Sequence, residues 1–475
     1  MHRYEDYANE LARQIQDGQL KPGDRLPSVR ELKRQRGVSA STVFAAYYLL
    51  ESQGYVEARN RSGYYVRHKS PAVAETELSP SVPQTYSMQV DISSLVFQVL
   101  EQARRRDMVP MGSAFPSSEL FPLDQLAMGM GRAMRRMEPW QTVEDLSPGN
   151  PALRQQIAMR YGLMGIGVSP SELVVTGGAM EALNLALEVT TQPGDVVAIE
   201  TPAFYAALQA LERRGLRAVE VQTHPRTGIN LESLKDVLDS HPVKACWFMP
   251  TFQNPMGSTM PDDAKAALVE LLRVKQIPLI EDDVYGELHH GTRRPPPAKA
   301  WDRHGGVLHC GSFSKSLAPG YRIGWVAAGR FAMQLARHKL MSSLATALPS
   351  QLAILDFLQE RSFERHLRSL RQALARQQAA AIRAIEQYFP VGTKVTRPEG
   401  GYFVWVEFPP DIDALSVHRL ALLQGIGVAP GHLFSADHRY CHHLRINHGH
   451  PGDPRTEASF KVLGEIVHHA HKSRG

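Results

Sequence analysis

Short apolar runs alternate with stretches of helical periodicity over most of the chain, from Asp91 onward. Helical patterns such as Ala179–Val189 and Ala264–Lys275 separate the runs. The runs expected to form strands are Leu173–Gly178, Val196–Glu200, Ala218–Gln222, Ala245–Pro250, Pro278–Asp283, Val307–Phe313 and Arg322–Gly329. This alternation is typical of βαβ units and predicts a mostly parallel sheet. Ligands of such sheets bind at the carboxyl ends of the strands.

The first 70 residues have a different pattern. Tyr4 to Asp17 has apolar residues at helical spacing, a second helix is expected to begin near Pro27 or Ser28, and a third covers Ser39–Ser52. Two helices joined by a short turn that contains glycine form a helix-turn-helix. Residues 54–66 then predict a hairpin with a basic tip, so the whole module resembles a winged helix. The alternative is a three-helix module that binds proteins.

A stretch without apolar period follows, from Ser70 to Gln89, and it contains Pro71, Pro80 and Pro83. It predicts a flexible linker, which would span roughly 25 Å root-mean-square. The expected organisation is therefore a DNA-binding module over residues 1–70, a linker over 71–90 and a large body over 91–475.

Charge is unevenly distributed along the 475 residues. The whole chain has a net charge of +5, and residues 1–70 carry 12 Lys and Arg against 8 Asp and Glu. A basic module on a nearly neutral body suggests a polyanion as partner. No apolar run approaches the roughly 18 residues of a membrane span, the N-terminus lacks the apolar core of a signal peptide, and the three cysteines are widely separated. These features predict a cytoplasmic protein without a membrane partner.

Candidate chemistry is concentrated in the stretch from Leu308 to Gly324. Lys315 can form a Schiff base with an aldehyde cofactor. Ser312 and Ser314 offer hydroxyls to a phosphate, and Arg322 offers a bidentate guanidinium. An aldehyde with a phosphate is pyridoxal 5'-phosphate (PLP). Alone, a Ser-x-x-Lys sequence would indicate a surface turn with a solvated lysine, so the interpretation depends on the other strand ends.

Three other strand ends carry groups that suit the same cofactor. Gly178 and Ala179 open a helix whose bare N–H groups can cradle a phosphate. Phe204 follows the next strand and can stack on a pyridine ring. Asn254 offers an amide to a phenolic oxygen.

The remaining candidates concern the pyridine ring and the substrate. Asp282 lies at a strand end, where its carboxylate can keep a pyridine nitrogen protonated so that the ring accepts electrons. Tyr285 comes three residues later. Near the C-terminus, Arg445 offers a guanidinium to a substrate carboxylate.

Together these motifs resemble the fold-type-I, class I and II aminotransferases, from about Asp145 to Asn447. The resemblance implies an α/β PLP-dependent transferase body, with a large part at about 145–370 and a small C-terminal α+β domain at about 371–475. It also implies a homodimer with sites completed at the subunit interface. The roles it implies are Lys315 as the Schiff-base lysine, Asp282 as pyridinium partner, Asn254 and Tyr285 at the phenolic oxygen, Phe204 in stacking, Gly178, Ala179, Ser312, Ser314 and Arg322 around the phosphate, and Arg445 as carboxylate clamp.

One position departs from the family pattern. Enzymes of this fold often place a tyrosine about five residues before the glycine of a Gly-x-Pro-x-Leu-Arg motif, where it reaches the phosphate across the dimer interface. Here Gly149 begins that motif and Glu144 stands in place of the tyrosine. This replacement weakens the case for efficient turnover.

The N-terminal motifs resemble the winged helix of the GntR family of bacterial regulators. They are Leu-Pro-Ser-Val-Arg-Glu-Leu, Gly-Val-Ser-Ala-Ser-Thr-Val and Leu-Glu-Ser-Gln-Gly-Tyr-Val. The resemblance implies that Arg30, Ser39, Ser41 and Phe44 contact double-stranded DNA, although many relatives have an arginine where Phe44 stands. The hydroxyl of Thr42 also suits a groove, and the hairpin residues Arg59 and Arg61 suit phosphates or a minor groove.

A winged helix ahead of an aminotransferase-like body resembles the MocR subgroup of GntR regulators. This resemblance implies a PLP-dependent transcription factor that senses an amine, an amino acid or PLP itself. The alternative is an aminotransferase that exchanges an amino group between an amino acid and a 2-oxo acid, with the DNA-binding module secondary. The histidines near the C-terminus fit no standard ligand spacing, so no metal site is predicted.

Overall fold

The computed structural model describes residues 3–17, 19–21, 23–28, 31–32, 39–52, 55–59, 63–66, 78–84, 86–89, 93–102, 107–360, 362–437, 439–450 and 454–472. The chain forms two compact units, and Thr76 is the last N-terminal residue of the first. Each unit has its own hydrophobic core.

The N-terminal unit is a small helical domain with a two-stranded hairpin. Its elements are α1 (Arg3–Gln16), α3 (Ala40–Ser52), β1 (Val56–Arg59) and β2 (Gly63–Val66). The two strands pair antiparallel, with Val56 opposite Val66. The buried residues of this core are Tyr7, Ala8, Leu11, Ala12, Leu26, Leu32, Val43, Ala46, Tyr47, Leu50, Val56 and Val66. Because these residues recur at helical spacing on α1 and α3, each helix buries one stripe.

The expected second helix is visible at its start. The backbone N–H of Ser28 donates to Glu31 Oε2 at 2.6 Å, and that of Glu31 donates to Ser28 Oγ at 3.3 Å. This reciprocal pair is a capping box, which satisfies N–H groups at a helix N-terminus. Glu31 and Leu32 are helical, and residues 33–38 lie outside the described residues. The predicted N-terminal helix-turn-helix domain with its hairpin is confirmed.

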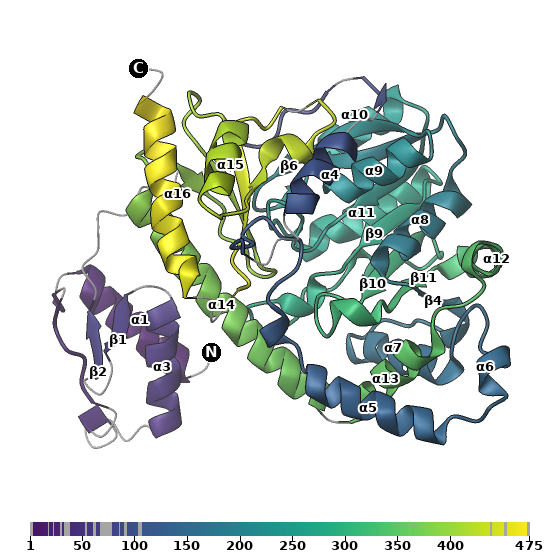
Figure 1. The fold of residues 1–475 in the computed structure, drawn as a ribbon, viewed down its shortest axis with the longest axis horizontal. Coiled ribbons are helices and arrows are strands. Elements are labelled where there is room, and N and C mark those ends of the chain that lie inside the picture. The colour runs from purple at the N-terminus through teal and green to yellow at the C-terminus, as the bar shows by residue number, and fades with distance from the viewer. Residues whose placement is uncertain are drawn as a thin grey trace. The chain divides into compact units, whose positions relative to one another are not determined.

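A nine-stranded sheet organises the body (Figure 1). Its strands are β3 (Met88–Gln89), β4 (Leu173–Thr176), β5 (Val196–Thr201), β6 (Arg217–His224), β7 (Gly228–Ile229), β8 (Val243–Phe248), β9 (Leu279–Asp282), β10 (Val307–Ser312) and β11 (Gly324–Ala327). The order along the sheet is β3-β6-β5-β8-β9-β10-β11-β4, with β7 paired to β6. Strands β6, β5, β8, β9 and β10 run parallel to one another, and β11 runs antiparallel to both its neighbours. The predicted mostly parallel sheet is confirmed.

Helices cover both faces of this sheet. They are α4 (Ser93–Gln102), α5 (Leu123–Arg136), α6 (Gln141–Glu144), α7 (Pro151–Leu163), α8 (Ala179–Thr190), α9 (Tyr205–Arg213), α10 (Leu231–Ser240), α11 (Asp262–Val274), α12 (Ala332–Ser343) and α13 (Leu348–Gln359). Along β5, Val197 packs into the cluster that contains α8 and α9, whereas Val196 and Ala198 pack into the cluster that contains α10 and α11. Successive side chains of a strand point to opposite faces, so strands covered on both sides are apolar throughout.

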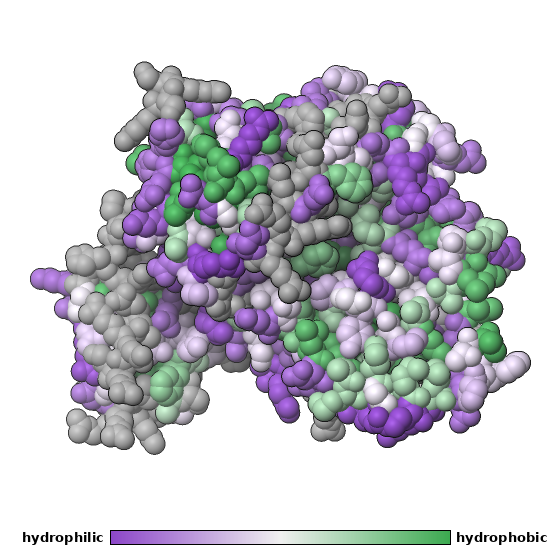
Figure 2. Space-filling model, in the orientation of Figure 1, coloured by the Kyte–Doolittle hydropathy of each residue, from purple (hydrophilic) through white to green (hydrophobic). Residues whose placement is uncertain are grey.

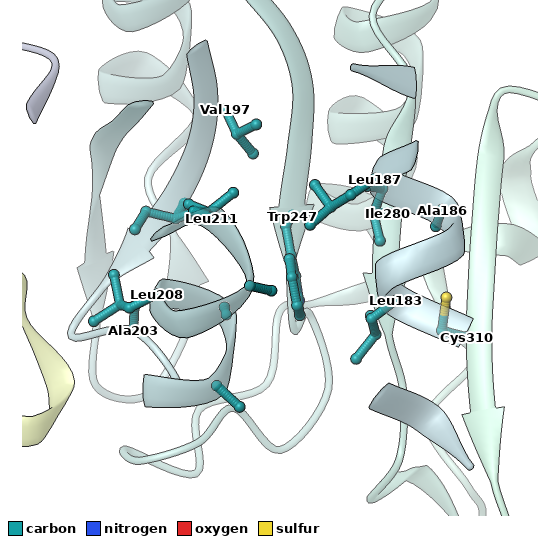
Figure 3. Packing of buried hydrophobic residues seen from close by; sticks show 14 of the residues in the cluster. Leu183, Ala186, Leu187, Val197, Ala203, Leu208, Leu211, Trp247, Ile280 and Cys310 are labelled. Carbon is teal, nitrogen blue, oxygen red and sulfur yellow. The ribbon is translucent and has the colours of Figure 1, made fainter. Parts of the chain in front are cut away.

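Trp247 of β8 shows how the first face is packed. In Figure 3 its indole lies between the leucines of α9, Leu208 and Leu211, and those of α8, Leu183 and Leu187. All five side chains are buried. This layer fixes α8, and the N-terminus of α8 in turn belongs to the candidate site.

The C-terminal part forms a smaller α+β domain, as predicted. Its four-stranded sheet has the order β12-β13-β15-β14, and each strand pairs antiparallel with its neighbour. The elements are α14 (Ser362–Tyr388), β12 (Lys394–Val395), β13 (Phe403–Glu407), α15 (Ala414–Leu423), β14 (Ala429–Pro430), β15 (His443–Asn447) and α16 (Arg455–Lys472). Among the described residues, none of the helices is long and apolar enough to cross a membrane.

The second half of the predicted linker is not free chain. Residues 78–84 lie beside β6, where the Ser81 N–H donates to Thr223 O at 3.0 Å and the Thr223 N–H donates to Ser81 Oγ at 2.7 Å. Met88 pairs with Ala218 at the edge of the sheet. The prediction of a flexible linker over 71–90 is therefore wrong from Leu78 onward. The segment is held by backbone and serine hydrogen bonds, which leave no apolar period in the sequence.

The packing of α8 makes a stability prediction. Leu187 is fully buried, so Leu187→Ala should lower the free energy of unfolding of the body by roughly 3–5 kcal/mol, through lost burial and a residual cavity. Leu163→Ala is the matched control, because that side chain at the end of α7 is 82% exposed and should change stability by less than about 0.5 kcal/mol. Urea unfolding followed by tryptophan fluorescence measures both, and equal effects would contradict the packing described here.

Candidate functional site

The predicted cofactor residues lie at or just after the ends of five strands. Gly178 follows β4, Phe204 follows β5, Asn254 follows β8, Asp282 ends β9 and Ser312 ends β10. All five strands point the same way, since β4 and β10 are both antiparallel to β11 and β10 is parallel to the others. Their carboxyl ends therefore meet along one edge of the sheet, where ligands of this architecture bind.

Two serines and an arginine form a hydrogen-bonded group at the end of β10. The Ser314 N–H donates to Ser312 Oγ at 3.0 Å, and the two hydroxyl oxygens are 3.0 Å apart. Arg322 reaches this group with Nη1, 3.3 Å from Ser314 Oγ, and donates through Nη2 to Gly177 O at 3.0 Å. The structure thus brings together three of the residues predicted to surround a phosphate.

Gly178 completes the same group from the other side. It caps α8 with a φ of 94°, which favours glycine. A side chain at this position would overlap the guanidinium of Arg322, and one at Gly324 would meet the carbonyl carbon of Gly178 at 2.6 Å. Ala179 is the first residue of α8. The N-terminus of a helix beside an arginine is a ready site for an anion.

An ion pair that the sequence did not predict stabilises the backbone next to Gly178. The Glu181 carboxylate accepts from the Gly177 N–H, and Lys339 Nζ of α12 donates to both Glu181 oxygens at 2.9 Å. Burial would raise the pKa of Glu181, but the Ser343 hydroxyl, the Gly177 N–H and Lys339 together hold it below its usual value. No sequence signal indicated the pair, because its members come from two helices far apart in the chain.

Asp282 has an unusual environment at the end of β9. It is buried, and neither carboxyl oxygen has a hydrogen-bond partner of normal geometry among the described residues. Burial, reinforced by the neighbouring Asp283, raises the pKa of Asp282 to about 7, while Lys315 and the N–H of Val284 oppose this rise. A buried carboxyl group without partners is costly and marks a place for a ligand that donates a hydrogen bond.

The next residue, Asp283, by contrast has two partners on one carboxyl oxygen, while its Oδ1 has no hydrogen-bond partner among the described residues. Arg294 Nη2 donates to Asp283 Oδ2 at 2.5 Å, and His309 Nε2 lies 3.0 Å from the same oxygen. Tyr161 OH is 2.6 Å from His309 Nδ1 and accepts from Trp325 Nε1 at 2.9 Å. The tyrosine hydroxyl therefore donates to Nδ1, so the His309 Nε2–H is the one that faces Asp283. Burial opposes ionisation, but Arg294 and His309 hold the pKa of Asp283 below its usual value.

Lys315 is partly buried and faces a short segment from the start of the body. Its Nζ donates to Ala114 O at 2.7 Å and lies 3.8 Å from the centre of the Phe115 ring. Burial, together with the charges of Arg445 and Arg322, lowers the pKa of Lys315 to about 7, against the effect of Asp282. An amine with this pKa is partly neutral near neutral pH, which is the nucleophilic form.

Arg445 joins the remaining predicted residues. This fully buried side chain of β15 donates through Nη1 to Asn254 Oδ1 at 3.0 Å and through Nη2 to Gly112 O at 2.8 Å. Asn254 Nδ2 in turn lies 3.4 Å from Tyr285 OH. The guanidinium carbon lies 4.2 Å from the centre of the Phe403 ring. Lys315, Asn254, Tyr285 and Arg445 are thus assembled around one site.

The segment Gly112–Phe115 is the main part of this site that sequence reasoning missed. Besides its bonds to Lys315 and Arg445, it accepts from Tyr402 OH at Ala114 O, 2.9 Å away, and from Asn447 Nδ2 at Ser113 O, 2.9 Å away. All these contacts use backbone carbonyls, which any residue supplies. The sequence could therefore not reveal them.

Phe204 and Glu144 are less clearly related to the site. Phe204 is the N-cap residue of α9, which places it at the edge of the site. Its ring centre is 4.9 Å from that of Tyr205, so the side chain also packs as a core aromatic. Glu144 ends the short helix α6, and its side chain lies outside the described ones. The structure leaves the role of this position open to experiment.

In the N-terminal unit, the described DNA-contact candidates lie on α3. Ser39 caps the helix, since its Oγ accepts from the Thr42 N–H at 3.2 Å and lies 2.8 Å from Thr42 Oγ1. Phe44 is exposed one turn further along. Arg30 and Arg61 lie outside the described residues. Ser41 belongs to α3 and Arg59 ends β1, but the side chains of Ser41 and Arg59 are not among the described ones.

Comparison with protein families gives two matches. Residues 145–457 match the aminotransferase class I and II family. Residues 3–66 match the gntR family of bacterial regulatory proteins. The first match covers the large sheet, the strand-end residues and Arg445, and the second covers the helix-turn-helix and the hairpin.

Two relatives align with this chain over nearly its whole length. The chain is 46% identical to an uncharacterised HTH-type transcriptional regulator of Escherichia coli, YdcR, over 98% of this chain and 99% of the relative. It is 37% identical to a second such E. coli regulator, YjiR, over 99% and 100%. The body resembles the α-aminoadipate aminotransferase LysN from Thermus thermophilus, solved with N-(5'-phosphopyridoxyl)-L-leucine, with a TM-score of 0.73 and 27% identity over 80% of this chain and 95% of that one. The fold and these neighbours imply PLP binding. The chain therefore belongs to the GntR-type helix-turn-helix regulators whose body is a class I and II aminotransferase domain, the MocR arrangement.

Proposed function

We propose that this chain is a DNA-binding transcriptional regulator whose body holds PLP and senses an amine, an amino acid or PLP itself. The observation that carries the proposal is the fusion of a GntR helix-turn-helix to a class I and II aminotransferase domain in one chain. Relatives of full length with the same fusion are named transcriptional regulators. A protein of this kind acts where the chromosome is, in the cytoplasm.

The residues of the body fit PLP. The unpartnered oxygens of buried Asp282 suit a protonated pyridine nitrogen. A side chain at position 178 would overlap the Arg322 guanidinium, so only glycine fits there, and the helix N-terminus beside this arginine suits a phosphate. Ser312, Ser314 and Arg322 would hold the phosphate oxygens. Asn254 and Tyr285 would face the phenolic oxygen, and Phe204 would lie against the ring. Lys315 is the amine available for covalent attachment.

When bound, PLP supplies an electrophilic aldehyde carbon and an electron-accepting ring. The chain supplies the surroundings of this chemistry. Lys315, with its pKa lowered to about 7, is the nucleophile and can later accept or return a proton at Nζ. Asp282, whose pKa is raised to about 7, would lie beside the ring nitrogen and accept a hydrogen bond from it, and β9 holds this carboxyl in place. The Asp283–Arg294 pair under it fixes the end of that strand.

Arg445 is the proposed clamp for the carboxylate of an amino-acid effector. Its two Nη groups now donate to Asn254 Oδ1 and Gly112 O, while its buried Nε has no hydrogen-bond partner among the described residues, so a carboxylate bound by Nη2 would exchange for the Gly112 carbonyl. This exchange would release one of the bonds that hold Gly112–Phe115 over Lys315. A ligand that favours the released arrangement shifts the body between two states by its differential affinity, which is the physical requirement for regulation.

The alternative function is an aminotransferase with a secondary DNA-binding module. It is favoured by one observation, namely that the nucleophile Lys315, the acid Asp282 and the clamp Arg445 are all present in one site. Steady turnover of amino acids with 2-oxoglutarate by the purified protein would support the enzyme. If the protein transfers one amino group and then stops, the result supports the regulator instead of the enzyme.

We propose in addition that the body forms a homodimer through an exposed apolar patch. Figure 2 shows hydrophobic residues gathered around α12 on the viewed face. The exposed apolar residues of α12, α6 and their flanking loops are Trp140, Val143, Leu146, Met333, Leu340, Met341 and Leu344. The Ser147 hydroxyl donates to Ala336 O of α12 at 2.8 Å, which holds the loop after α6 against α12. Contiguous apolar surface of this kind marks a protein interface.

The cofactor assignment predicts the behaviour of two variants. Purified protein should absorb visible light and retain the cofactor after borohydride reduction. Lys315→Ala should abolish this covalent attachment, because no other described lysine lies in the site. Asp282→Asn should retain the attachment but change the absorbance, because the charge beside the ring nitrogen is lost.

The control for the cofactor prediction is Lys235→Ala on α10, which should leave the spectrum unchanged. Mass spectrometry of the reduced, digested protein identifies the modified peptide. A reduced adduct of undiminished amount in Lys315→Ala would show that another lysine carries PLP.

The DNA-binding assignment predicts a strong dependence on salt. The logarithm of the affinity should fall with that of the salt concentration by about 0.9 for each phosphate contacted. Arg59→Ala with Arg61→Ala should weaken binding to all duplexes and reduce this slope. The matched control is Arg303→Ala with Arg330→Ala, two exposed arginines of the body. Titrations of labelled DNA at several salt concentrations measure the slope, and an unchanged slope in the hairpin variant would refute its phosphate contacts.

The dimer proposal predicts the state of a shortened protein. A fragment that begins at Leu78 should remain a dimer, because residues 78–89 belong to the body. In the full chain, Trp140→Glu with Met341→Glu should give a monomer, since these side chains are 71% and 75% exposed in the patch. Leu423→Glu, at an exposed position of α15, is the control. Sedimentation at micromolar concentration distinguishes the two states, and a dimer in the patch variant would mean that the interface lies elsewhere.

A further inference from the structure

The outward face of α3 carries aromatic side chains. Val43, Ala46, Tyr47 and Leu50 are buried in the core of the N-terminal unit. Ala40, Phe44 and Tyr48 recur every fourth residue and form an exposed stripe that lies beside the buried one. The Phe44 side chain is 49% exposed and that of Tyr48 is 52% exposed. Two exposed aromatic residues one helical turn apart give this face an apolar surface that suits a partner with apolar groups.

The part of α3 that carries this stripe has no charged or amide residue before Glu51. From Ala40 to Leu50 the sequence contains no Lys, Arg, His, Asp, Glu, Asn or Gln. The usual polar readers of base edges in the major groove are Arg or Lys on guanine and Asn or Gln on adenine. The helix that would enter the groove therefore lacks every one of these readers along its first three turns.

Two hydroxyl groups at the start of the helix, those of Ser39 and Thr42, already contribute to its structure. Ser39 Oγ accepts from the Thr42 N–H and contacts the Thr42 hydroxyl. Replacing an N-cap serine costs about 1 kcal/mol of helix stability, so a DNA-binding defect in Ser39→Ala would report on capping as well as on contact. Among the described side chains of α3, Phe44 and Tyr48 are the largest that face outward.

We infer that α3 recognises DNA through thymine methyl groups, with Phe44 as the reader and Tyr48 beside it. Of the groups in the major groove, only the C5 methyl of thymine is apolar, and an apolar side chain such as phenylalanine packs on it. The operator would therefore contain A·T pairs at the positions that α3 reaches. This inference rests on the proposed DNA-binding function and adds to it the chemical group that is read.

DNA is the occupant favoured for this face because of its place in the fold. The face belongs to the second helix of a helix-turn-helix, which is the element that enters the major groove, and residues 3–66 match a family of bacterial regulatory proteins. A protein partner for the same face is the competing occupant, and the experiment separates the two.

The test uses the full-length protein and a random-sequence duplex library. The duplexes it enriches are synthesised again with deoxyuridine in place of thymidine at single positions, which removes one methyl group each. At the positions that α3 reads, each uracil should weaken binding roughly fourfold, the value of one buried methyl. Uracil in the flanks should have no effect.

Protein variants assign the effect to a side chain. Phe44→Ala should weaken binding to the enriched duplex roughly tenfold and leave binding to unrelated duplexes and the salt slope unchanged, because an apolar contact involves no phosphate. On the uracil duplex the same substitution should cost much less, since the methyl it contacts is already gone. Phe44→Leu should restore part of the loss, and Phe97→Ala, an exposed aromatic of α4, is the control.

Each other outcome overturns a specific statement. If the protein binds no duplex, the proposed function fails and the inference falls with it. If it binds and every uracil is tolerated within twofold, the function stands and methyl recognition is wrong. Equal uracil effects in the wild type and in Phe44→Ala would assign the methyl to another residue. If Phe44→Ala changes the sedimentation coefficient but leaves the DNA affinity unchanged, the exposed face of α3 binds a protein partner and not DNA.

Discussion

Three consecutive buried carboxyl groups at the end of β9 impose the constraint on which the site depends. Burying a carboxylate is costly unless hydrogen bonds or an opposite charge compensate. Glu281 accepts from the backbone N–H groups of Ala298 and Lys299 at 2.6 and 2.9 Å, and burial raises its pKa. Asp283 is paired with Arg294 and His309. Asp282 alone is left without a partner of normal geometry, so the strand end is stabilised on both sides of the one carboxyl that a ligand can use.

The same logic applies to the two cations of the site. Arg445 is fully buried, and among the described residues it contacts no carboxylate but the carbonyl of Gly112, the amide oxygen of Asn254 and nearby aromatic rings. Lys315 rests on the Ala114 carbonyl and the Phe115 ring. Both cations thus use neutral groups of one segment as substitutes for an anion. Because a ligand carboxylate would satisfy Arg445 better than a carbonyl does, ligand binding and release of that segment are expected to be linked.

The sequence predicted the parts of this structure that have a local signal. Apolar runs located the strands of the body, and strand ends identified Lys315, Asp282, Asn254 and Arg445 as one group, with their roles taken from the family resemblance. Contacts made by backbone carbonyls or between distant helices had no such signal, as Gly112–Phe115 and the Glu181–Lys339 pair show. The length of the flexible linker was overestimated for the same reason, because the hydrogen bonds that hold residues 78–89 on β6 leave no periodic pattern in the sequence.

In the proposed homodimer, the shorter linker would limit how the two helix-turn-helix units can be arranged. The chain between Val66 and Leu78 reaches at most roughly 40 Å when fully extended, which still allows half-sites separated by a turn of DNA. Affinity and specificity also come from different surfaces in this arrangement. Arginines of the hairpin would supply salt-dependent attraction to any duplex, while the uncharged face of α3 adds nothing to that attraction and can only select among sequences. Under the proposed function, charged contacts would attract such a regulator to any duplex, and the apolar contacts would hold it where thymine methyl groups match.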